Sequence, residues 1–472
     1  MPTLLTECLS WRARLGEVSV PGSGAYLCEM AWLGGQHAER NVLIKVDGAR
    51  ITNVEIGGAR PADSSVTLPG LTLPGFANAH SHAFHRALRG RTHRGARSFW
   101  AWREAMYEVA ASLDPDRYFH LARAVYAEMA LAGVSAVGEF HYLHHGPDGM
   151  PYDDPNAFGE AMIEAAMEAG VRITLLDTCY LHGGIGKEPD DTQRRFSDGN
   201  AERWAQRVEA LRERPGVRVG AAIHSVRAVD PAAIAIVAEW ASARHAPLHA
   251  HVSEQPAENE QCLAAFGVTP TELLHHHGAL GDRFTAVHAT HVTEADLGLL
   301  GDARCWCCFC PTTERDLADG IGPAGALRDR GARLTLGSDS QAVIDPLEEA
   351  RSVELNARLA TGVRGTHEAP ALLQMATEHG HESLGWPEAG RIEPGALADF
   401  VTIGFDSVRT AGATDADALE IAVFAATASD VHHVVVGGRV VVENGRHRTI
   451  DVPAALRETL RAVRFRRSGA GT

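Results

Sequence analysis

The sequence predicts an α/β protein, in which a (β/α)8 TIM-type barrel is accompanied by a small β-sandwich domain built from both chain termini. Three observations carry this prediction. Short apolar runs alternate with longer helix-like stretches through the middle of the 472 residues. Eight such runs occur, which is the number of strands in a closed parallel barrel. The two ends of the chain instead carry short alternating segments separated by turn residues.

The apolar runs are continuous rather than alternating, as expected for strands that are buried on both faces of a parallel sheet. An open doubly wound sheet is the structural alternative, but no glycine-rich dinucleotide loop or phosphate-binding loop supports it. The barrel is therefore favoured. The predicted strands span residues 71–80, 134–142, 171–181, 217–226, 247–254, 284–291, 304–311 and 333–340.

The stretches between the runs are typical of helices. Residues 114–133 and 157–170 place apolar side chains at three- and four-residue steps, and glycine stands at the end of each. Strands that alternate with helices pair in parallel through right-handed crossovers. These stretches are thus expected to surround the barrel.

The terminal segments favour antiparallel strands. Residues 41–58, 395–405 and 432–447 contain short β-rich runs, and the Gly-Gly and Asn-Gly pairs predict hairpin turns. We therefore expect residues 1–70 and 391–450 to form the small β-domain. Residues 71–390 are then the barrel, and residues 451–472 a basic C-terminal helix and tail.

Composition restricts the partners and the compartment. With 44 Lys plus Arg against 60 Asp plus Glu, the net charge is −16, so a nucleic-acid or anionic membrane surface is not expected. No secretory signal or 18-residue apolar stretch occurs. Four of the eight cysteines crowd into residues 305–310, which suits a buried strand in a reducing compartment better than a disulfide framework. A cytoplasmic protein is expected.

Several predicted strands end in side chains that bind metals or transfer protons. The C-terminal ends of parallel barrel strands form one rim, so residues far apart in the chain converge there. A catalytic zinc takes nitrogen and oxygen ligands and keeps one position for water. The sequence therefore predicts one divalent metal ion, with zinc expected, although iron, manganese or cobalt suits the same donors. The expected ligands are His80, His82, His251 and Asp339.

The other histidine clusters are assigned no chemistry. His275, His276 and His277 are expected at an exposed helix end, and His144 and His145 form a loop pair with no assigned role. No second Cys/His pair at a suitable spacing accompanies the four clustered cysteines, so a zinc ribbon is not expected.

The segments LPGFANAHSH, HVSE, AVHATH and LGSDS, in this order, resemble the metal-dependent amidohydrolase superfamily. The resemblance implies a barrel whose metal is held by the four residues named above. Members with two metals use a carbamylated lysine at the end of strand four, and this chain has none there, so a mononuclear site is expected. The HVSE spacing is similar to the deaminase branch, in which the glutamate, here Glu254, shuttles protons to the leaving nitrogen.

A narrower resemblance rests on residues 80–86, 99–104, 139–145, 224–229 and 311–320, which look like the formimidoylglutamate deiminases. That family converts N-formimino-L-glutamate to N-formyl-L-glutamate and ammonia in histidine degradation. Two substrate carboxylates need cationic donors, for which the guanidinium fork is well suited. One position departs from the family, which usually has glutamine where this chain has His85. The residues expected to bind the substrate are His85, Arg103, Tyr142, His224 and Arg227.

The resemblance also implies a mechanism. A zinc-bound hydroxide attacks the formimino carbon, Asp339 beside His288 accepts the proton of the water, and Glu254 protonates the departing nitrogen. Two alternatives remain: a deaminase of an aminated heterocycle such as guanine, cytosine or adenosine, and a non-catalytic scaffold barrel. The resemblance also implies a homodimer, since similar proteins of this family form dimers.

Overall fold

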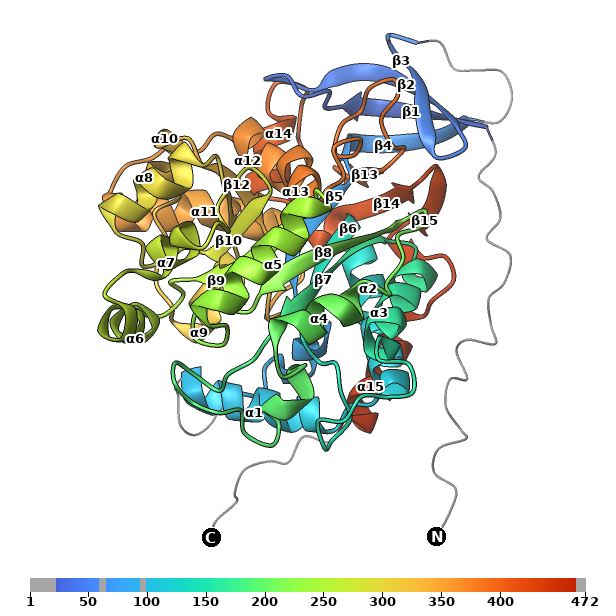
Figure 1. Ribbon diagram of the computed structural model, residues 1–472. Coiled ribbons are helices and arrows are strands. Elements are labelled where there is room, and N and C mark those ends of the chain that lie inside the picture. Colours follow the sequence, from blue (N-terminus) through green and yellow to red (C-terminus); the bar gives the residue numbers. More distant parts are fainter. Residues whose placement is uncertain (1–22, 59–64, 94–98, 464–472) are drawn as a thin grey trace, which may run out of the picture.

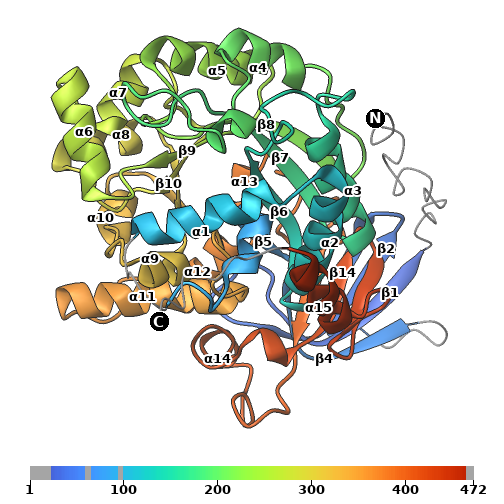
Figure 2. The ribbon, with the colours of Figure 1, turned by 90° about the horizontal axis from the view of Figure 1, so that it is seen from below.

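The computed structural model describes residues 23–58, 65–93 and 99–463, and it confirms the predicted fold class. Eight strands form one parallel sheet in chain order, and it closes where Ser81 bridges to Asp339. Its ring of helices is visible in Figure 2. The barrel strands are β5 (Phe76–Ser81), β6 (Val134–His141), β7 (Arg172–Cys179), β8 (Val217–Ile223), β9 (Leu248–Val252), β10 (Phe284–His288), β11 (Trp306–Phe309) and β12 (Arg333–Leu336).

Capping residues explain where several helices begin and end. Asp114 caps α2 by accepting a hydrogen bond from the backbone N–H of Arg117, and Gly170 ends α3 in the left-handed conformation. Both helices fall within the stretches expected to be helical. The helices around the barrel are α2 (Pro115–Leu131), α3 (Ala157–Ala169), α4 (Ala201–Val208), α5 (Pro231–Ala243), α6 (Pro256–Phe266), α7 (Pro270–His276), α8 (Glu294–Asp302), α9 (Pro311–Leu317), α10 (Ala324–Asp329), α11 (Pro346–Thr361), α12 (Ala369–Ala376) and α13 (Glu378–Ser383).

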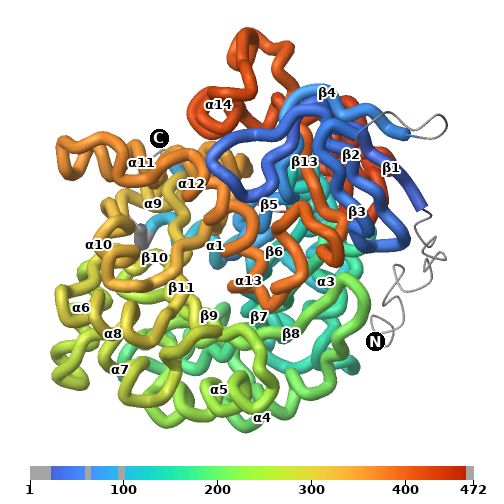
Figure 3. The backbone as a smooth tube through the Cα atoms, turned by 90° about the horizontal axis from the view of Figure 1, so that it is seen from above, coloured from blue at the N-terminus to red at the C-terminus, as the bar shows by residue number. Residues whose placement is uncertain are grey.

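A second sheet is made from the two ends of the chain and lies beside the barrel (Figures 1 and 3). The N-terminal and C-terminal strands meet where β4 pairs antiparallel with β13. Gly437 and Gly438 form one of its hairpin turns with positive φ angles. Its strands are β1 (Gly24–Ala31), β2 (Glu39–Asp47), β3 (Arg50–Ile56), β4 (Ser65–Pro74), β13 (Phe400–Ile403), β14 (Val431–Val436), β15 (Arg439–Glu443) and β16 (Arg446–His447).

The structure corrects the first barrel strand, which was expected over residues 71–80. Residues 71–74 belong to β4 of the second sheet, and β5 begins only at Phe76. The change of sheet occurs at Gly75, where a Cβ atom would lie 2.4 Å from Oγ of Ser135. A continuous apolar run conceals this change, because both strands are buried here.

The remaining segments complete the architecture. Helix α14 (Ala418–Phe424) precedes β14, and α15 (Val452–Ala462) forms the described part of the expected C-terminal helix. The expected tail from residue 464 onward lies outside the described residues. Among the helices that are described, none combines the length and the apolar character needed to cross a bilayer.

One helix closes over the rim of the barrel. Helix α1 (Phe99–Ala111) lies below the barrel in Figure 1 and crosses in front of its strands in Figure 2. Its residues Arg103, Met106 and Tyr107 line the same cavity as residues from the C-terminal ends of the barrel strands. The helix therefore covers the face on which the site was predicted.

Candidate active site

Four predicted ligands converge at the C-terminal rim. Their donor atoms, three imidazole nitrogens and one carboxylate oxygen, all lie within 4.8 Å of one another. Nε2 of His251 lies 3.1 Å from Nε2 of His80 and 3.4 Å from Nε2 of His82. Oδ1 of Asp339 lies 3.4 Å from Nε2 of both His80 and His82. This N₃O arrangement suits a divalent metal ion such as a catalytic zinc.

The outer nitrogens of two ligands are already occupied. Nδ1 of His82 lies 2.9 Å from the carbonyl oxygen of Phe140, and Nδ1 of His251 lies 2.9 Å from that of His224. A carbonyl can only accept, so each Nδ1 carries the proton and each Nε2 presents its lone pair inward. Burial lowers the pKa of both imidazoles, which favours the neutral, ligating form. The residues therefore fit a metal ion.

Buried polar contacts fix the region at the end of β5 and the segment that follows β12, which together supply the ligands His80, His82 and Asp339. Glu139 accepts hydrogen bonds from the backbone N–H of Ala83 at 2.7 Å and from Oγ of Ser81 at 2.8 Å. Asn78 accepts from the N–H of Ser338 at 2.9 Å. A Cβ atom on Gly337 would lie 2.7 Å from Cβ of the ligand His80, so only glycine allows this approach.

Two carboxylates flank the imidazole of His288. Its Nε2 lies 3.9 Å from Oε1 of Glu254 and 3.7 Å from Oδ2 of Asp339. Burial raises the pKa of Glu254. At Asp339 burial acts in the same direction, but His288 and the neighbouring histidines together outweigh it and lower the pKa. One carboxyl group is therefore suited to hold a proton and the other to remain ionised.

Arg227 is paired with acids of its own chain. Its Nη2 lies 3.6 Å from Oε2 of Glu254, and its Nε lies 3.1 Å from Oε2 of the buried Glu258. The side chain still lines the cavity. Glu258 lies on α6, one helical turn beyond the HVSE segment, so that segment does not itself indicate this pairing.

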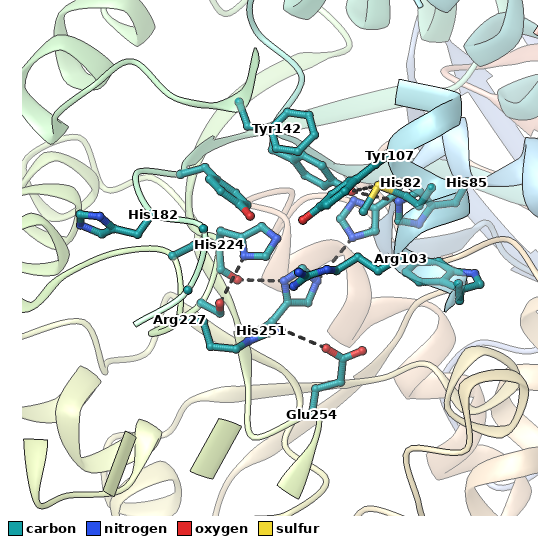
Figure 4. Close-up of a pocket in the computed structure, with 18 of the residues that line it drawn as sticks. His82, His85, Arg103, Tyr107, Tyr142, His182, His224, Arg227, His251 and Glu254 are labelled. Atoms are coloured by element: carbon teal, nitrogen blue, oxygen red, sulfur yellow. Dashed lines mark hydrogen bonds and ion pairs between the residues drawn. The ribbon is translucent and has the colours of Figure 1, made fainter. Parts of the chain in front are cut away.

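The other expected substrate contacts share the cavity. Nε2 of His85 lies 2.9 Å from the hydroxyl of Tyr142, and burial lowers the pKa of His85 to about 4. His224 packs edge-on against Tyr142, with ring centroids 5.6 Å apart. The guanidinium of Arg103 lies over the ring of Tyr107. Figure 4 shows Arg103, Tyr142, His224 and Glu254 around the same space.

The cavity has a volume of about 130 Å³ and includes residues that the sequence did not single out. Tyr107 and Tyr180 flank Gln193, whose Nε2 donates to their hydroxyls at 3.0 and 2.8 Å. Lys187 lines the cavity from a turn closed by two backbone hydrogen bonds with Gly183 and Gly184. Tyr107 reaches the site from α1 and Lys187 from a loop, where the sequence carried no positional signal. Tyr180 directly follows β7, at a predicted strand end, but no role was assigned to it.

The His144–His145 pair, which the sequence placed in a loop without an assigned role, is buried. Nε2 of His145 lies 3.1 Å from Oδ1 of Asp198, and Arg207 pairs with both Asp198 and Asp177. Asp177 belongs to β7 and the histidine pair follows β6, so this cluster is a buried ionic network near the C-terminal ends of these two strands. His275 and His276 are exposed at the end of α7, as expected.

The fold and this site define a barrel hydrolase with a candidate metal centre. The amidohydrolase family model matches residues 71–441, and the chain belongs to that family. It is 36% identical to the formimidoylglutamate deiminase of Pseudomonas aeruginosa over 86% of this chain and 92% of that protein. It is 30% identical to a 5-methylthioadenosine/S-adenosylhomocysteine deaminase of Natronomonas pharaonis over 86% and 89%. The chain is thus a deaminase-type hydrolase acting on C–N bonds.

Solved structures agree with the fold. An amidohydrolase from Brucella melitensis superposes with a TM-score of 0.86 at 34% identity, covering 93% of this chain and 99% of that one. The match extends over the barrel and the second sheet alike, since nearly the whole of both chains is included.

Proposed function

We propose that this enzyme hydrolyses N-formimino-L-glutamate to N-formyl-L-glutamate and ammonia. The observation that carries the proposal is a cavity beside the four-donor site into which Arg103 and Arg227 both project. A substrate with two carboxylates uses two such cations. The 36% identity to a formimidoylglutamate deiminase supports the same substrate.

His80, His82, His251 and Asp339 would hold one divalent metal ion, for which zinc suits the donors best. When bound, this ion supplies Lewis-acid activation of water. The chain's own part is to present three neutral imidazoles and one carboxylate on a rigid rim. No lysine stands at the end of β8, which supports a single ion.

Proton movements are assigned to the buried acids. Asp339 accepts the proton of the attacking water, because its lowered pKa keeps it ionised beforehand. His288, 3.7 Å away, stabilises the oxygen that becomes negative. Glu254 protonates the departing nitrogen, which leaves as ammonia. Burial raises its pKa, which favours the protonated form relative to an exposed glutamate.

A substrate panel tests this assignment against the alternative of a ring deaminase. That alternative is supported by the 30% identity to a 5-methylthioadenosine/S-adenosylhomocysteine deaminase. We expect turnover of N-formimino-L-glutamate and competitive inhibition by glutarate. Aminated purines and pyrimidines should be neither substrates nor inhibitors. Turnover of 5-methylthioadenosine or guanine with no inhibition by glutarate would replace the proposal with the ring deaminase.

A further inference from the structure

We propose that Glu314 is a positioning residue that holds the imidazole of His288 in its working orientation, an inference that rests on the proposed function. Glu314 lies in the segment 311–320, for which the mechanism above has no use. Oε1 of Glu314 lies 3.3 Å from Nδ1 of His288, on the side of the ring that faces away from the reacting groups.

The contact has a defined direction. A carboxylate oxygen can only accept, so Nδ1 of His288 carries a proton and donates it to Glu314. Nε2 is then the atom that faces Glu254 at 3.9 Å and Asp339 at 3.7 Å. Without an acceptor at Nδ1, the ring could rotate about its side-chain bonds, and Nε2 would no longer be held toward Glu254 and Asp339. Glu314 therefore determines which nitrogen meets the substrate.

The backbone at His288 has an uncommon conformation. His288 and Ala289 have φ angles of 71° and 48°, a left-handed conformation that non-glycine residues rarely adopt. Such strain persists only where surrounding contacts determine it. Glu314 is one of these contacts, through its hydrogen bond with Nδ1 of His288. Glu314 is itself held in place, because it is 3% exposed and accepts a hydrogen bond from the backbone N–H of Cys310 at 2.8 Å.

Both hydrogen bonds go to one oxygen, Oε1, which permits a selective substitution. Glu314→Gln keeps an oxygen at that place and can accept both bonds. Glu314→Met has similar length and accepts neither. If Glu314 acts by position, the glutamine variant should keep most of the turnover that the methionine variant loses.

Glu349 provides a matched control. It is equally buried and accepts a hydrogen bond from the backbone N–H of Thr312 at 2.9 Å, also at the start of α9. Glu349→Met therefore removes a buried carboxylate and strands a backbone N–H, yet no contact with His288 is lost. Both methionine variants should lower the melting temperature, which separates a stability effect from a positional one.

The first readout is kinetic, with N-formimino-L-glutamate and the metal-loaded enzyme. For Glu314→Met we expect kcat to fall roughly 10–100-fold, the range for partners that orient a functional group, with KM within about threefold. Glu314→Gln should stay within about tenfold of the parent, as one neutral acceptor replaces a charged one. An equal loss of kcat in Glu349→Met, or full activity in Glu314→Met, would overturn the inference.

The second readout needs no substrate, so it stands even if the proposed function fails. An imidazole N–H donating to a buried carboxylate gives a downfield proton resonance in the NMR spectrum. We expect this resonance in the parent and in Glu349→Met, and its loss in Glu314→Met and in His288→Gln. If Glu314→Met does not fold, Glu314→Asp, one methylene shorter, should still lose the resonance. A resonance that persists in both folded Glu314 variants would contradict the assignment.

Discussion

Nη2 of Arg227 lies 3.6 Å from Oε2 of Glu254. A residue proposed to bind a substrate carboxylate thus contacts the residue proposed to protonate the leaving group. A carboxylate arriving at Arg227 competes with Glu254 for the guanidinium. Substrate recognition and proton transfer are therefore expected to be coupled.

The proposed contact between Arg227 and a substrate carboxylate predicts non-additive kinetics. We compare N-formimino-L-glutamate with its α-amide and γ-amide, using the parent and Arg227→Gln. Losing either the cation or the carboxylate that it binds should lower kcat/KM about 100-fold, as expected for a charge-assisted contact of roughly 2–3 kcal/mol. For one of the two amides, the loss of kcat/KM in Arg227→Gln acting on that amide should be at least about tenfold smaller than the product of the two single losses. The reason is that the guanidinium and that carboxylate interact directly. If the two single losses of kcat/KM simply multiply for both amides, Arg227 binds neither carboxylate.

Glu254→Gln should nearly abolish turnover without loss of metal. Glutamine keeps the shape of the side chain but cannot deliver a proton, so we expect kcat to fall roughly 10²–10⁴-fold. Metal content measured by mass spectrometry should be unchanged, since Glu254 is not in the four-donor set. Glu260→Gln, exposed on helix α6 just after Glu254, is the control. Activity of Glu254→Gln within tenfold of the parent would remove its assigned role.

His85→Gln should tighten substrate binding. Nε2 of His85 is engaged with the hydroxyl of Tyr142, and its buried Nδ1 has no hydrogen-bond partner within the described chain. Glutamine can keep the contact with Tyr142 and offer its second amide group to the substrate. We expect KM to fall about fivefold, which corresponds to one neutral hydrogen bond of about 1 kcal/mol, with little change in kcat. Steady-state kinetics would contradict this if KM rose.

The buried network around Arg207 predicts a pH-dependent stability. Burial alone would raise the pKa of Asp198, but the hydrogen bond from His145 and the charge of Arg207 lower it well below its usual range. A lowered pKa in the folded state stabilises the protein above the unfolded value of about 3.9, and this stabilisation is lost as the pH falls further.

Asp198→Asn should therefore be less stable than the parent at pH 7, by roughly 2 kcal/mol for a buried charged hydrogen bond. The difference should narrow as the pH falls below about 4, because the parent then loses the same contribution. Chemical denaturation at several pH values measures both quantities. A difference that stayed constant down to pH 2.5 would exclude the assigned role of this carboxylate.

The barrel was predictable because its signals are local. Eight apolar runs, helical periodicity and a glycine after helix α3 each reflect the chain's immediate surroundings. The change of sheet at Gly75 was not predictable, since β4 and β5 are both buried and read as one run. The pairing partner of a strand depends on tertiary contacts that periodicity does not record.

The candidate site, like the fold, was predictable only in part. The convergence of His80, His251 and Asp339 follows from the common direction of barrel strands, so strand ends alone predicted it. No role was predicted for Glu314 or Glu258, because both lie on helices that follow the strands. Their partners, His288 and Arg227, lie on neighbouring elements. Contacts between side chains of different elements become visible only in the folded structure.

The most direct test of the proposed function is ammonia release from N-formimino-L-glutamate by the zinc-loaded protein, with the second product identified by mass. The proposal predicts one N-formyl-L-glutamate for each ammonia. Glutamate with formamide would contradict the assigned bond cleavage while keeping the substrate. No turnover by a protein that demonstrably holds zinc would contradict the substrate itself.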